Sequence, residues 1–126
     1  MIYLYVALGG AIGAAARYGT GLWVAAYIGA GSVFPWPTLA INIAGSFLIG
    51  LIWSLFAEAE WFVDWGRAFL VVGLLGGFTT FSTFSWEVMQ LLMQQKALLA
   101  LAYIGLSVVV CVLGVWLAMQ ITRTFV

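Results

Sequence analysis

The sequence predicts an all-α membrane protein, with four transmembrane helices in a single domain over residues 1–126. Of its 126 residues, 66% are hydrophobic and only 6% are charged, and the mean hydropathy is +1.18. A soluble domain has about a quarter of its residues charged, so the solvent of this chain must be lipid. Because a bilayer core of about 30 Å takes about 20 apolar residues per helix, the length allows at most four or five crossings.

Charged and helix-breaking residues divide the apolar runs. We expect a first helix over residues 2–28, ended by the glycines and prolines between Gly29 and Pro37. A second helix follows over residues 38–57, and the charged cluster from Glu58 to Arg67 forms an aqueous loop. A third helix over 67–93, a short turn and a fourth helix over 97–123 complete the bundle. Aromatic residues mark the expected membrane interfaces, namely Trp23, Tyr27, Trp36, Trp53, Trp61 and Trp65.

Small residues recur at the spacing that lets two helices approach closely. They pair as Gly9 with Gly13 and as Gly73 with Gly77. The pattern predicts tight helix packing and leaves open whether the partner helix belongs to the same chain.

The basic residues give little orientation bias. Four crossings place both termini and the second loop on one face, with Arg67 and Arg123; the other face has Lys96 and, if it reaches that side, Arg17. Because an excess of Lys and Arg on the cytoplasmic side normally fixes orientation, this balance predicts insertion in both orientations.

Composition excludes several classes of function. The chain has no histidine, and its one cysteine, Cys111, lies in an apolar run. Metal clusters, disulfide frameworks and histidine-based catalysis are therefore not expected, and we predict that the protein is not an enzyme. The neutral net charge gives no indication of nucleic-acid binding, and the N-terminus lacks the basic region of a signal peptide.

The most informative segment spans residues 73–87, in the middle of the third predicted helix. Its glycines and hydroxyl residues are poor helix formers, so we expect a break near residues 76–80. Freed carbonyls at a break are candidate ligands for a hard cation, and hydroxyls can donate to an anion. Phe81 and Phe84 share one helix face and present partly positive ring edges. The alternatives are a kink stabilised by hydroxyls and a phenylalanine pair that only packs.

Three segments carry a resemblance to a known family, the bacterial fluoride channels called Fluc or CrcB. They read Gly-Gly-Phe-Thr-Thr-Phe-Ser-Thr-Phe-Ser at 76–85, Gly-Gly-Ala-Ile-Gly-Ala-Ala-Ala-Arg-Tyr at 9–18 and Ile-Asn-Ile-Ala-Gly-Ser-Phe-Leu-Ile-Gly at 41–50. The similarity covers essentially the whole chain, in the same order and spacing.

The resemblance implies an antiparallel, dual-topology homodimer in the bacterial inner membrane, with two narrow fluoride pores. It also implies a structural sodium ion between the subunits, held by the main-chain carbonyls of Gly76 and Thr79. Phe81 and Phe84 correspond to the pore phenylalanines, and Asn42 to a pore-lining asparagine. An intramembrane asparagine can alternatively bridge helices.

Further polar residues complete the expected anion pathway. Thr80, Ser82 and Thr83 accompany the two phenylalanines, while Tyr103 and Ser107 correspond to pore-facing positions of the fourth helix. We interpret Arg17 as a vestibule charge that attracts anions, the alternative being a side chain that snorkels to the interface. Glu87 is either its counter-charge or a capping acid.

The predicted function is passive, fluoride-selective export that relieves fluoride toxicity, since a narrow bore with dense donors can replace the water of a small anion. One alternative is a small proton-coupled multidrug antiporter, which would need a membrane-embedded carboxylate. Another is a non-transporting assembly subunit.

Overall fold

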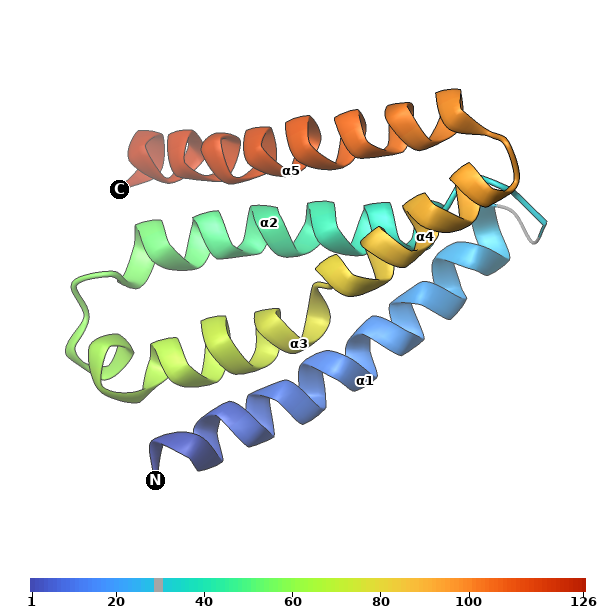
Figure 1. Ribbon diagram of the computed structural model, residues 1–126. Coiled ribbons are helices and arrows are strands. Elements are labelled where there is room, and N and C mark those ends of the chain that lie inside the picture. Colours follow the sequence, from blue (N-terminus) through green and yellow to red (C-terminus); the bar gives the residue numbers. More distant parts are fainter. Residues whose placement is uncertain (29–30) are drawn as a thin grey trace.

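The computed structural model describes residues 1–28 and 31–126, and its described elements are all helical, as predicted. The helices run alongside one another, with α1 and α4 inclined to α2 and α5 (Figure 1). In chain order the elements are α1 (Ile2–Ile28), α2 (Trp36–Phe56), η1 (Phe62–Leu75), α3 (Gly76–Phe78), α4 (Phe81–Met93) and α5 (Ala97–Phe125). Both chain ends lie at the end of the bundle where α2 connects to η1 (Figure 1).

Two helices begin earlier than the sequence pattern indicates. α2 starts at Trp36 and not at residue 38, because its first turn accommodates Pro37. Proline lacks an N–H, but an N–H in the first turn would have no acceptor within the helix, so nothing is lost there. The next helix starts at Phe62 and not at residue 67, so Asp64 lies in its first turn, where the helix dipole favours an acid. Gly29 and Ala30, part of the predicted end of the first helix, lie outside the described residues.

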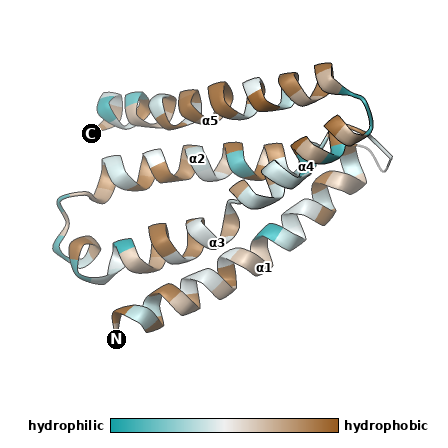
Figure 2. Cartoon of the chain, in the orientation of Figure 1, coloured by the Kyte–Doolittle hydropathy of each residue, from teal (hydrophilic) through white to brown (hydrophobic). Residues whose placement is uncertain are grey.

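The surface of the bundle is suited to lipid. Among the described residues, three helical segments are long and apolar enough to cross a membrane, namely Trp36–Phe56, Phe62–Met93 and Ala97–Phe125. Hydrophobic residues cover most of α5, whereas hydrophilic residues gather near its C-terminal end and in the turn before it (Figure 2). These features support an integral membrane protein.

Glycines bring α1 against η1 and α3 with direct contact between the main chains. A Cβ added at Gly13 would collide with the carbonyl oxygen of Leu74. One added at Gly77 would lie 2.6 Å from the carbonyl oxygen of Gly10. The predicted packing through small residues is thus confirmed for this helix pair, and the partner helix belongs to the same chain.

α2 and α5 form the second close pair. A Cβ added at Gly50 would lie 2.7 Å from the carbonyl oxygen of Val115 and 2.9 Å from the Cβ of Ala118. A small core of Leu39, Phe84, Leu91, Ala100 and Tyr103 joins this pair to α4. The junction between α3 and α4 is therefore held between two tightly packed helix pairs.

Candidate functional site

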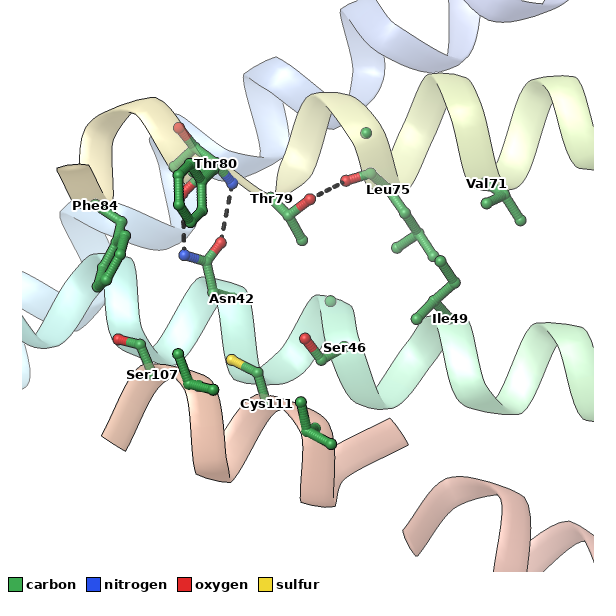
Figure 3. Close-up of a pocket in the computed structure, with 15 residues that line it drawn as sticks. Asn42, Ser46, Ile49, Val71, Leu75, Thr79, Thr80, Phe84, Ser107 and Cys111 are labelled. Carbon is green, nitrogen blue, oxygen red and sulfur yellow. Dashed lines mark hydrogen bonds between the residues drawn. The ribbon is translucent and has the colours of Figure 1, made fainter. Parts of the chain in front are cut away.

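A cavity of about 460 Å³ opens beside the junction between α3 and α4. Side chains from α2 and α5 form one side of it, and the end of η1, α3 and the start of α4 form the other (Figure 3). Its polar lining comes from Asn42, Ser46, Thr79, Thr80, Ser107 and Cys111.

The helical backbone is interrupted at two threonines next to this cavity. Thr79 (φ −83°, ψ 158°) and Thr80 (φ −152°, ψ 118°) are both extended. The amide and the hydroxyl of Thr79 both donate to the carbonyl of Leu75, at 2.9 and 2.8 Å. Thr80 then caps α4, because its Oγ1 accepts from the amide of Thr83 at 3.2 Å. The two threonines thus finish one helix and start the next.

Asn42 holds the extended segment from the side of α2. Its Nδ2 donates to the carbonyl of Thr80 at 3.0 Å, and its Oδ1 accepts from the amide of Thr80 at 2.9 Å (Figure 3). Thr80 is only 8% exposed, so these bonds satisfy main-chain groups that the interruption would otherwise leave buried and unpaired. Asn42 therefore bridges helices, and one N–H of its amide is left for another acceptor.

The same bonds redirect two amides that a continuous helix would use internally. The Thr80 amide, which would donate to the carbonyl of Gly76, donates to Asn42 instead. The Thr83 amide, which would donate to the carbonyl of Thr79, donates to the Thr80 hydroxyl. The interruption thus removes the helical donors of the Gly76 and Thr79 carbonyls, and both residues line the cavity.

Phe81 and Phe84 occupy very different environments in the single chain. Their ring centroids are 5.4 Å apart, yet Phe81 is 79% exposed and Phe84 only 8%. Phe84 packs edge-on against Tyr103, with centroids 5.0 Å apart and an interplanar angle of 79°. Packing within the chain thus fixes the ring of Phe84, while the chain leaves Phe81 uncovered.

Glu87 accepts two short hydrogen bonds inside the bundle. Its Oε1 accepts from the hydroxyl of Thr38 at 2.7 Å, and its Oε2 accepts from the hydroxyl of Tyr103 at 2.6 Å. The carboxyl group therefore connects α4 to α2 and α5. It lies well inside α4, so it does not cap the start of that helix.

The cavity brings together a majority of the residues that the sequence singles out. Its lining includes Asn42, Gly76, Thr79, Thr80, Phe81, Phe84 and Ser107. Other predicted residues lie outside that lining: Tyr103 is fully buried, Arg17 is on α1, and Ser82 and Thr83 are exposed near the start of α4.

Sequence reasoning missed several residues of this region. Gly45 lies directly against the interruption, since a Cβ there would collide with the Cγ2 of Thr79. Ser46 and Cys111 line the cavity. The spacing in the sequence indicates these two residues. Ser46 is four residues from Asn42, and Cys111 is four residues from Ser107, so each pair shares one helix face.

The comparisons with known proteins cover nearly the whole chain. A family model described as "CrcB-like protein, Camphor Resistance (CrcB)" matches residues 4–119. A relative from Methylocella silvestris is 45% identical over 121 residues, covering 93% of this chain and 89% of its own. One from Hahella chejuensis is 44% identical over 120 residues, covering 95% and 93%. One from Thermus thermophilus is 52% identical over 101 residues, covering 80% and 77%.

Each of these relatives is named "Fluoride-specific ion channel FluC". The family match extends from α1 to α5 and includes every residue that lines the cavity. The chain therefore belongs to the CrcB family.

Proposed function

We propose that this chain is a fluoride-selective passive ion channel, which exports fluoride across the bacterial inner membrane and so relieves fluoride toxicity. The observation that carries the proposal is the extended pair Thr79–Thr80, placed beside a cavity with polar lining inside a very apolar helical bundle. Irregular backbone at membrane depth is tolerated where it is covered by protein or lines a watery path. Relatives named as fluoride-specific channels indicate the ion.

The working unit is an antiparallel homodimer in which α1 supplies the fourth crossing of each chain. Gly76, whose carbonyl loses its helical donor, is exposed in the single chain, and so are Phe81, Ser82 and Thr83. Lipid cannot satisfy a carbonyl, so a second copy covering this surface accounts for it. The nearly equal count of basic residues at the two ends supports insertion in both orientations.

The Gly76 and Thr79 carbonyls of each subunit would hold a structural sodium ion between the two subunits. These carbonyl oxygens suit sodium, because a hard cation prefers oxygen ligands. Both oxygens are also without their helical donors, since the Thr80 and Thr83 amides donate to side chains instead. One subunit supplies two such oxygens, fewer than the about six that hard cations commonly take. A bound sodium ion would supply the positive charge that these carbonyl dipoles need at the contact between the subunits.

Fluoride is small and strongly hydrated, so the pathway must replace lost water with hydrogen-bond donors and partly positive ring edges. The Ser107 hydroxyl and the second N–H of Asn42 are suitable donors, and Arg17 makes the entrance electropositive. Phe84 is held in place by Tyr103, while Phe81 extends toward the second subunit. The proposed pathway comprises Arg17, Asn42, Thr80, Phe81, Ser82, Thr83, Phe84, Tyr103 and Ser107.

Flux through proteoliposomes tests this function. Wild-type protein is expected to release fluoride down its electrochemical gradient, as followed with a fluoride electrode. Phe81→Ile and Phe84→Ile remove the aromatic edges at similar bulk and are expected to slow release by about tenfold or more. Variants that conduct like wild type would show that the phenylalanines do not form the path.

The antiporter alternative is less well supported. It needs a membrane carboxylate that is free to exchange protons for substrate, whereas both oxygens of Glu87 accept hydrogen bonds from hydroxyls within the bundle. The names of the relatives do not favour it either.

A further inference from the structure

A second cavity, of about 570 Å³, lies between α2 and α5. Its volume is within the range of pockets that hold small ligands. α2 contributes Ile43, Ala44 and Phe47 to its lining, and α5 contributes five residues, of which Val110 is the first and Leu117 the last. We call this hollow the α2–α5 groove.

The groove and the cavity beside the interrupted helix lie on opposite faces of this helix pair. Ala44 follows the cavity residue Asn42 by two positions, and Leu113 follows Cys111 by two. Successive residues of an α-helix are turned by about 100°, so each groove residue is turned by about 200° from its neighbour in the cavity. None of the described residues lines both hollows. Because the proposed second subunit covers the interrupted helix, the groove faces lipid.

The lining of the groove is apolar and leaves open space. Apart from the indole N–H of Trp116, the described residues that line it have hydrocarbon side chains or none. A Cβ added at Gly114 would lie 3.7 Å from the amide nitrogen of Phe47, an ordinary contact, whereas one at Gly50 would lie 2.7 Å from a carbonyl oxygen. Glycine at 114 is therefore not required for the two helices to pack. An unfilled hollow there would forfeit dispersion contacts along both walls.

Both walls of the groove lie near the middle of their membrane spans. Phe47 is close to the centre of α2 (Trp36–Phe56), and Val110 is close to the centre of α5 (Ala97–Phe125). In a hydrocarbon core of about 30 Å, this depth is occupied by the methyl-end halves of lipid chains, away from headgroups and water. A ligand with buried polar groups would find few partners in this lining and would lose free energy on entering it.

We infer that the α2–α5 groove is a lipid site, which holds the methyl-end half of one phospholipid acyl chain. The chain contacts both helices at once and fills the space left by Ala44 and Gly114. The lining contains none of the residues of the proposed ion path, so this site is additional to that path and does not depend on which ion the protein conducts.

Photolabelling of full-length protein in phosphatidylcholine liposomes tests the site. The probe is a phosphatidylcholine with a diazirine near the methyl end of one chain, and mass spectrometry locates the adducts formed under ultraviolet light. We expect severalfold more adduct in the groove than on the exposed residues of segment 98–106 of the same helix. Labelling of the groove should also saturate as the probe fraction rises, because a held chain occupies a single site. A probe with its diazirine beside the ester should label the groove severalfold less.

Two variants fill the groove from opposite walls, and a third is their control. Gly114→Leu and Ala44→Leu should each lower the labelling of the groove to the level of segment 98–106. Gly105→Leu makes the first of these changes elsewhere on α5, where nothing lies within 4 Å of an added Cβ, and should leave the labelling unchanged.

Three results would overturn the inference. The first is labelling of the groove no stronger than that of segment 98–106, and the second is labelling that neither filling variant lowers. The third is an unlabelled groove together with a lower cross-linked dimer fraction in Gly114→Leu, which would assign the groove to a second copy of the chain instead of a lipid.

Discussion

Replacing Asn42 by alanine is expected to destabilise the extended segment between α3 and α4. The side chain makes two hydrogen bonds, of 3.0 and 2.9 Å, to the main chain of Thr80, which is 8% exposed. The variant leaves one buried amide and one buried carbonyl unpaired. At about 1–3 kcal/mol for each group, the expected loss is about 2–6 kcal/mol.

Hydrogen–deuterium exchange of the segment around Thr80 measures this loss directly. A free-energy loss of about 1.4 kcal/mol corresponds to a tenfold change in an equilibrium constant. A loss of about 2 kcal/mol therefore predicts about thirty-fold faster exchange of the Thr80 amide in Asn42→Ala. Ser46→Ala is the matched control, because it removes a cavity-lining hydroxyl on the same face of α2 without touching the Thr80 bonds. If both variants exchange at the wild-type rate, Asn42 does not hold the extended segment.

The remaining predictions concern close packing and the cation. Gly45→Ala adds a Cβ that collides with the Cγ2 of Thr79, so fluoride release should fall severalfold; unchanged release would mean that this threonine can move freely. Gly13→Ala forces α1 away from the main chain of Leu74 and should cost about 1–3 kcal/mol in unfolding measured in detergent. Gly19→Ala, where nothing lies within 4 Å of an added Cβ, should be close to neutral. Replacing sodium by a large organic cation should reduce the dimer fraction in cross-linking, and an unchanged fraction would argue against a structural cation.

The fold class follows from the sequence because an apolar chain with so few charges has few options in lipid. The interruption in the third helix is harder to place. Its glycines suggest a break beginning at Gly76, yet Gly76–Phe78 are helical and the extended residues are Thr79 and Thr80. Gly77 serves instead to bring the chain against Gly10.

The contact that holds the extended residues is remote in sequence. Asn42 precedes Thr80 by 38 residues, and local helix propensity carries no information about such a bond. The same is true of Glu87, whose partners lie on α2 and α5. The residue types of the site could be predicted, whereas their pairing depends on how the helices pack.

The spacing of polar residues within each helix predicts a further part of the cavity lining. Asn42 with Ser46 and Ser107 with Cys111 each share a helix face, and all four line the cavity. Reading the four-residue interval would have added Ser46 and Cys111 to the candidate residues. It could not have shown that Ser107 is left without a partner.

The most direct test of the central claim compares two anions in one preparation. Liposomes containing the full-length protein are loaded with equal potassium fluoride and potassium chloride, and valinomycin is added to start the efflux. We expect rapid release of fluoride with chloride retained, because a narrow path with dense donors favours the smaller ion. Equal release of both anions, or no release of fluoride, would contradict it.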